Sequence, residues 1–70
     1  MPNWILYKDY PMCVNTNYIF QLFSHGISVC FNRDGCGANT LGSYESEERA
    51  KEVLHEITSF TGNIYQMPDK

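Results

Sequence analysis

The sequence predicts an α+β fold, in which a small antiparallel β-sheet of three to five strands packs on one C-terminal amphipathic helix. Two observations predict it: short β-prone runs separated by turn residues fill residues 4–44, and a single apolar stripe with helical spacing follows them. A chain of 70 residues has room for only one small core, so residues 1–70 are expected to form a single domain.

The first predicted strand covers residues 4–7, an apolar and β-prone run close to the N-terminus. Pro11 ends this region, because proline forces the residue before it into an extended geometry and offers no N–H. A turn is expected at residues 15–17, since asparagine side chains readily bond to nearby backbone groups. We expect residues 4–7 to join the edge of the sheet formed by the following strands.

Three further strands are expected at residues 18–23, 27–32 and 40–44, joined by short connections. Gly26 suits a tight turn that needs a positive φ, and the loop at 33–39 contains an Asp-Gly hairpin signal. Alternation in the middle strand places three apolar residues on one face: Ile27, Val29 and Phe31. Adjacent strands with such short connections predict an antiparallel meander.

The helix has a clear beginning and one apolar face. Ser46 is a favourable N-cap, and Glu47 and Glu48 lie in the positively polarised first turn. The apolar stripe consists of Ala50, Val53, Leu54, Ile57 and Phe60. Gly62 suits the left-handed position that follows many helices, and residues 64–65 are expected to form a last short strand.

Composition excludes several classes of protein. The net charge is −3 with only five Lys and Arg, so no basic stripe is available for a nucleic-acid backbone. No apolar run approaches the roughly 18 residues of a membrane span. The odd number of cysteines and the lack of a signal-peptide pattern predict free thiols in a reducing cytoplasm. Cys30 and Cys36 straddle a turn, and an approach of the two across the hairpin stays open.

No catalytic residue, cofactor or metal site is expected, so the protein is not predicted to be an enzyme. His25, Cys30 and Cys36 lack the spacing of zinc ligands. The glycines at 34–37 allow a phosphate-loop interpretation, but no Lys-Ser/Thr pair follows, and a plain hairpin turn is favoured. No helix N-terminus or basic cluster is placed to lower the pKa of a cysteine for nucleophilic catalysis.

Aromatic residues make up 14% of the chain, more than one small core needs. Neighbouring strand residues point to opposite faces, so one helix cannot cover all the rings. The uncovered rings suit either a homo-oligomer interface or a pocket in which they stack on a planar, nucleotide-like ligand. Arg33, Lys8 and Asn39 are candidates to hold its phosphate or ribose groups. The predicted ligand-binding residues are Trp4, Tyr7, Arg33, Asn39, Thr40 and Tyr44.

The pattern Leu-Gly-x-Tyr-x-Ser-Glu-Glu-Arg-Ala-Lys-Glu-Val-Leu-x-Glu-Ile at residues 41–57 resembles the C-terminal half of short proteins from Gram-positive bacteria, their phages and mobile elements. The Trp-Ile start at residue 4 and the Asn-rich segment at 15–19 are similar too, whereas 8–14 and 34–37 depart from the pattern. The likeness speaks to fold more than to activity.

The resemblance implies a non-enzymatic anti-defence protein that acts in the host cytoplasm if a phage encodes it. Some such proteins are sponges, which bind a cyclic nucleotide immune signal, such as a cyclic ADP-ribose isomer, at a subunit interface without cleaving it. The alternative is a small inhibitor or adaptor that binds a host protein directly. A small hydrolase ranks last.

Overall fold

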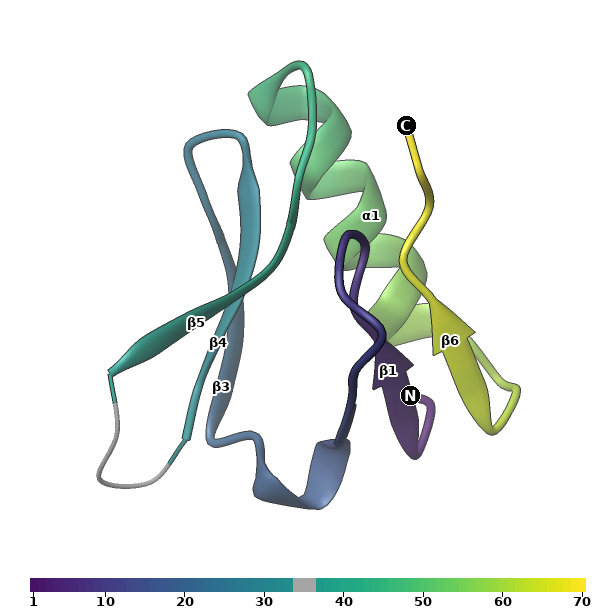
Figure 1. Cartoon of the computed structure of the whole chain (residues 1–70). Helices are drawn as coiled ribbons and strands as arrows, with labels where there is room; N and C mark the ends of the chain where they lie inside the picture. The colour runs from purple at the N-terminus through teal and green to yellow at the C-terminus, as the bar shows by residue number, and fades with distance from the viewer. Residues whose placement is uncertain (34–36) are drawn as a thin grey trace.

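The computed structural model describes residues 1–33 and 37–70, which form two three-stranded sheets and one helix (Figure 1). The predicted α+β class, with a helix in the C-terminal half, is confirmed. The helix α1 (Glu47–Ser59) packs against strands β3 (Gln21–His25) and β4 (Ser28–Asn32). No helix in the described part of the chain is both long enough and apolar enough to cross a membrane.

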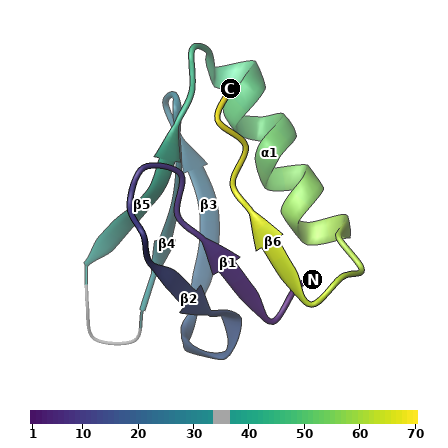
Figure 2. The ribbon, with the colours of Figure 1, turned by 45° about the vertical axis from the view of Figure 1, so that its right-hand side comes forward.

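The first sheet has the order β2-β1-β6 and joins the two ends of the chain (Figure 2). Its central strand, β1 (Trp4–Leu6), pairs antiparallel with β2 (Cys13–Asn15) and parallel with β6 (Ile64–Gln66). The last strand predicted at residues 64–65 is thus confirmed. Placing residues 4–7 at the edge of the meander was wrong, because β1 lies at the centre of a separate sheet.

The second sheet is the predicted antiparallel meander of β3, β4 and β5 (Ala38–Ser43). Between Val29 and its neighbour Cys30 the register shifts, so that Leu41 is an extra residue in β5. The main-chain oxygen of Leu41 accepts a hydrogen bond of 3.0 Å from the N–H of Lys8. Because Lys8 follows β1, this bond ties the first sheet to the second.

The strand predicted at residues 18–23 begins later, at Gln21, because a 3₁₀ helix precedes it. This helix, η1 (Thr16–Tyr18), is capped by Asn15, whose side-chain oxygen accepts from the N–H of Asn17 at 2.9 Å. The hydroxyl of Thr16, the first residue of η1, donates to the main-chain oxygen of Pro2 at 2.8 Å. A local side-chain cap therefore overrides the β-propensity of the aromatic residues that follow.

The turn after β3 contains Gly26 with φ of 58°, as predicted. Val29 and Phe31 are buried on β4, but Ile27 is 47% exposed because it lies in the turn rather than in the strand. The predicted Asp-Gly turn and the relation of Cys30 to Cys36 involve residues 34–36, which lie outside the described residues.

The helix begins and is buried as its sequence predicts. The Ser46 side-chain oxygen accepts from the Arg49 N–H at 3.1 Å, and Ala50, Val53 and Ile57 are buried. Gly62 does not adopt a positive φ, so that prediction was wrong. A Cβ at this position would lie 2.7 Å from the Phe60 ring, so a larger residue would require that ring to move.

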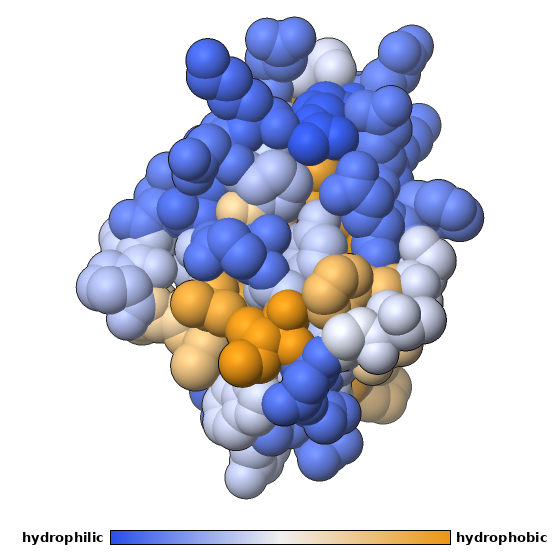
Figure 3. Space-filling model, turned by 90° about the vertical axis from the view of Figure 1, so that its right-hand side faces the viewer, coloured by the Kyte–Doolittle hydropathy of each residue, from blue (hydrophilic) through white to orange (hydrophobic). Residues whose placement is uncertain are grey.

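The core lies between the sheets and the helix and draws residues from nearly every element. Its buried members are Ile5, Val29, Phe31, Leu41, Tyr44, Ala50, Val53, Ile57, Tyr65 and Met67. The outward side of the first sheet remains partly apolar, since Trp4 and its neighbour Ile64 are 39% and 54% exposed. Figure 3 shows this side, with hydrophobic side chains gathered in the lower half beneath a hydrophilic upper half.

Candidate functional site

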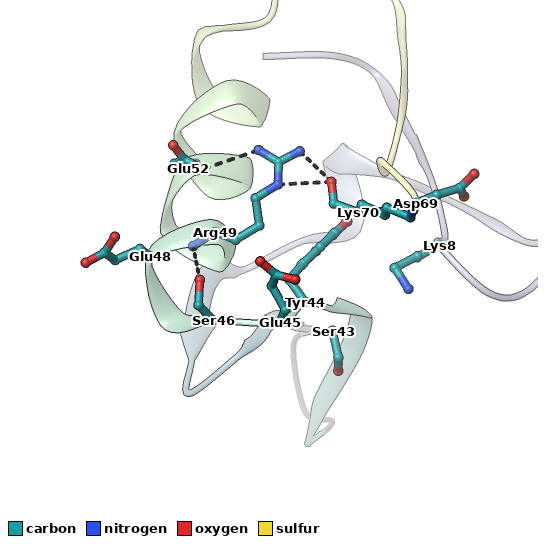
Figure 4. A pocket seen from close by; sticks show the side chains of 10 residues that line it. All are labelled: Lys8, Ser43, Tyr44, Glu45, Ser46, Glu48, Arg49, Glu52, Asp69 and Lys70. Carbon is teal, nitrogen blue, oxygen red and sulfur yellow. Dashed lines mark hydrogen bonds and ion pairs between the residues drawn. The ribbon is translucent and has the colours of Figure 1, made fainter.

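A surface depression of about 640 Å³ lies between the helix N-terminus and the C-terminal segment (Figure 4). Tyr44 is at its centre, and its ring is approached by two cations, the Lys8 Nζ at 5.6 Å and the Arg49 guanidinium at 5.8 Å. The Tyr44 hydroxyl donates to the main-chain oxygen of Pro68 at 2.9 Å. Burial raises the pKa of Tyr44 to about 12, with nearby carboxylates adding and Arg49 opposing.

Arg49, one of the cations of this depression, is already engaged by the chain itself. Arg49 donates from Nε and Nη2 to the main-chain oxygen of Lys70 at 3.0 and 2.8 Å. Its Nη1 lies 3.4 Å from Glu52 and 3.5 Å from Glu56. Four carboxylates also line the depression, those of Glu45, Glu48, Glu52 and Asp69. An anionic ligand would therefore meet repulsion and few unused donors.

A second site consists of two adjoining depressions, of about 350 and 250 Å³, that share Tyr18 and Arg33. We call it the Arg33 surface. The larger depression is also lined by Asn17, Ile19 and Phe20. The smaller one is also lined by Trp4, Cys13, Val14 and Asn15. None of these lining residues is acidic, and none of the carboxylates in the described residues lies within ion-pair distance of Arg33.

Local structure explains why aromatic rings face outward at the Arg33 surface. On β1 the neighbour Ile5 is fully buried, so alternation turns Trp4 toward the opposite side. The capped η1 ends at Tyr18, and the N–H of Phe20 donates to the main-chain oxygen of Asn32 at 2.8 Å, beside Arg33. Figure 2 shows η1 at the lower end of the molecule, where β4 ends.

Exposure of these rings is high. Tyr18 and Phe20 are 67% and 78% exposed, and Trp4 is 39% exposed. Isolated apolar side chains on a surface are common, but here three aromatic residues line adjoining depressions that share Arg33. Flat rings stack on planar groups, and a guanidinium binds phosphate through a planar fork of N–H donors. The Arg33 surface thus suits a ligand that is both planar and anionic.

The structure brings together only some of the six predicted ligand-binding residues. Trp4 and Arg33 meet at the Arg33 surface. Tyr7 is half-buried, with its ring 6.3 Å from that of Phe31 and edge-on to it. Burial raises the pKa of Tyr7, and the positive charge of Arg33 partly opposes this rise. Tyr7 is therefore within electrostatic reach of Arg33 but is not among the residues that line the Arg33 surface.

Asn39 and Thr40 lie on β5 and line neither the Tyr44 depression nor the Arg33 surface. The Asn39 amide donates to the main-chain oxygen of Gly37 at 3.2 Å, and the Thr40 hydroxyl lies 3.8 Å from the Cys30 sulfur. Tyr44 belongs to the first depression. The ligand-binding role of all six residues stays a prediction.

Two residues of the Arg33 surface, Tyr18 and Phe20, were missing from the predicted ligand-binding set. The reason is that residues 18–23 were assigned to a strand, which would have buried one of the two faces. The signal that reveals them is local: Asn15 followed by Thr16 and Asn17 is a capping pattern that starts a short helix.

Comparisons with protein-family models, with curated protein sequences and with solved structures find no significant match to this chain. Across residues 1–33 and 37–70, no group of three or more His, Cys, Asp and Glu side chains is placed to hold a metal ion. Cys13 is exposed and lines the Arg33 surface, whereas Cys30 is buried. Functional inference therefore depends on the geometry of the surface itself.

Proposed function

We propose that this protein is a binding protein that sequesters a nucleotide-like ligand at the Arg33 surface without cleaving it. The observation that carries the proposal is the juxtaposition of Trp4, Tyr18 and Phe20 with Arg33, in depressions that no carboxylate of residues 1–33 and 37–70 lines. Stacking of a base on an aromatic ring contributes about 1–3 kcal/mol, and the guanidinium supplies charge-assisted hydrogen bonds to phosphate.

A second copy of the chain completes the site in this proposal. Pockets for small ligands generally bury about 70–90% of the ligand surface. Depressions of 350 and 250 Å³ edged by rings as exposed as Phe20 leave one side of a bound nucleotide in water. Two Arg33 surfaces facing each other across a two-fold axis would enclose it, since such an interface uses the same patch on both copies.

The resemblance to short phage-type proteins gives the proposal its biological setting. The ligand would be a cyclic nucleotide immune signal, such as a cyclic ADP-ribose isomer, in the cytoplasm of a bacterial host. Sequestration needs affinity and abundance rather than catalysis. A surface built from stacking rings and one cation supplies affinity without requiring a nucleophile or a general base.

The test is a titration of the protein with cyclic ADP-ribose isomers, followed by calorimetry and by melting temperature. Arg33→Ala is expected to weaken binding at least tenfold, because it removes the guanidinium of the surface. Lys51→Ala is the matched control, since it removes one cation from the exposed side of α1 and is expected to leave binding unchanged. Intact affinity in the Arg33→Ala variant would refute the assignment.

The fate of the ligand separates binding from catalysis. Heating the loaded protein and analysing the supernatant is expected to return the ligand intact, whereas recovery of products would identify an enzyme. Sedimentation with and without ligand measures the number of copies. A monomer that binds the ligand fully would contradict the completion of the site by a second copy.

A second candidate function is direct binding of a host protein. The residue types exposed at the Arg33 surface favour it, because Trp, Tyr and Arg are the most frequent energetic anchors of protein interfaces. In that case no nucleotide raises the melting temperature. A host protein would instead co-purify with the native chain and be lost from the Tyr18→Ala and Arg33→Ala variants.

A further inference from the structure

The Arg33 surface is divided into two halves, and each half has its own aromatic ring. Trp4 lines one depression and Phe20 lines the other, while Tyr18 and Arg33 line both. Arg33 therefore lies where the two halves meet. An arrangement of ring, cation and ring matches a ligand in which two planar groups are joined through an anionic linkage.

We propose that the ligand is a dinucleotide, with one base in each half of the Arg33 surface and its phosphate linkage on Arg33. This inference rests on the proposed function and specifies a ligand with two bases, whereas a cyclic ADP-ribose isomer has one base and would fill only one half. The smaller depression, about 250 Å³, is below the usual range of about 300–1,000 Å³ for small-molecule sites, and the larger, about 350 Å³, is near its lower end. Each half accommodates one base rather than a whole nucleotide.

Both halves also offer an amide that reads the edge of a base. Asn17 lines the larger depression and Asn15 the smaller one. The side-chain oxygen of Asn15 already accepts the N–H of Asn17 at 2.9 Å, which leaves the Asn15 amino group to donate. Since an amide NH₂ donates and does not accept, the half that contains Trp4 favours a base edge with an acceptor.

The charge of the surface favours a linkage over a terminal phosphate. Among the described residues that line the two halves Arg33 is the one cation, so each copy of the chain contributes one guanidinium. A phosphodiester carries one negative charge and presents two unesterified oxygens, which matches the two parallel N–H donors of a guanidinium. A terminal phosphate carries about −1.5 to −2 charges at neutral pH, which is more than the guanidinium of one copy balances.

The experiment compares adenylyl-(3′,5′)-adenosine, which has two rings and one phosphodiester, with AMP, which has one ring and more negative charge. We expect the dinucleotide to bind at least tenfold more tightly than AMP, a difference that charge alone cannot produce. Trp4→Ala and Phe20→Ala are each expected to weaken dinucleotide binding about tenfold, because each removes a ring on which one base stacks.

The matched control is Ile64→Ala, which removes an exposed apolar side chain from the strand beside Trp4 but outside the Arg33 surface. Circular dichroism checks that each variant is folded, and the control is expected to bind as the native chain does. If Ile64→Ala weakens binding as much as Trp4→Ala and Phe20→Ala do, the losses are structural and the two-ring assignment is refuted.

The outcomes distinguish the inference from the proposed function. Equal affinity for AMP and the dinucleotide, with binding still lost in the Arg33→Ala variant, overturns the two-ring site and leaves the proposed function standing. Dinucleotide binding that neither Trp4→Ala nor Phe20→Ala weakens likewise overturns the two-ring site and leaves the proposed function standing. Failure of AMP and the dinucleotide to bind overturns the inference, and failure of the cyclic ADP-ribose isomers as well overturns the proposed function.

Discussion

Replacing Gly42 by alanine is expected to weaken the connection between the two sheets. The new Cβ would lie 2.8 Å from the Cβ of Lys8 and 3.1 Å from its Cδ, whereas ordinary contacts of a Cβ begin at 3.4 Å. The Lys8 N–H donates to the main-chain oxygen of Leu41 at 3.0 Å. Lys8 can move away from the new methyl group only by lengthening the hydrogen bond that joins the sheets.

The magnitude follows from two opposing effects. Inserting a methyl group into a packed position costs about 1–3 kcal/mol. Alanine also restricts the unfolded chain more than glycine does, which returns about 0.4–1 kcal/mol. The expected net loss is about 1–2 kcal/mol in the free energy of unfolding. In a domain of this size each kcal/mol lowers the melting temperature by about 4–8 °C, so a decrease of about 5–15 °C is expected.

Urea unfolding provides the measurement, with the fluorescence of Trp4, the single tryptophan of the chain, as the probe. Gly37→Ala is the matched control, because a Cβ built at Gly37 meets no atom of the described residues within 4 Å. This control is expected to be as stable as the native protein or up to about 1 kcal/mol more stable.

A double-mutant cycle tests whether the clash with Lys8 is the cause. Lys8→Gly removes the Cβ atom that the new methyl group would meet, so Gly42→Ala is expected to cost less than about 0.5 kcal/mol in that background. Lys8→Ala retains the Cβ atom, and there the full cost is expected to persist. The reasoning is refuted if Gly42→Ala leaves the midpoint unchanged, or costs the same in both backgrounds.

Two further predictions concern the helix cap and the buried tyrosine. Ser46→Ala removes the side chain that accepts the Arg49 N–H at 3.1 Å, so it is expected to lower the free energy of unfolding, measured in urea, by about 1 kcal/mol. Ser46→Asp restores a cap and is the control. Equal urea midpoints for Ser46→Ala and the native chain would contradict this prediction. Burial raises the pKa of Tyr44 to about 12, so the unfolded chain loses this proton near pH 10 while the folded chain retains it. The stability that Tyr44 contributes is therefore complete below pH 10 and is lost between pH 10 and about 12. The urea midpoint is expected to decline less over this range in the Tyr44→Phe variant than in the native chain. Parallel declines would exclude the tyrosine as the cause.

The parts of the fold that the sequence predicted are those that neighbouring residues determine. The Ser46 cap and the stripe from Ala50 to Ile57 are local patterns, and both are confirmed in α1. The meander follows from short connections, which leave adjacent strands little choice but to pair. Alternation on β4 correctly predicted burial of Val29 and Phe31, and it failed at Ile27 only because the turn extends to that residue.

What the sequence did not predict depends on partners that lie far apart in the chain. β1 pairs with β6, so that Trp4 lies opposite Ile64, and no local period encodes a pairing across such a separation. The Arg33 surface likewise depends on residues that lie far apart in the chain. Trp4 and Arg33 were both predicted to bind ligand, but their meeting requires β1, η1 and the end of β4 to converge. Tyr18 was missed because a cap at Asn15 outweighed its preference for a strand.

The parallel pairing of β1 with β6 makes the first sheet depend on contacts between residues far apart in the sequence, such as Ile5 with Tyr65. Such a contact carries a large loop-closure entropy, and folds rich in distant contacts assemble slowly. The meander and α1 are contiguous in the sequence, so we expect them to form before this pairing. Docking of β1 against β6 is then expected to be a late step of folding, on which the fluorescence of Trp4 would report.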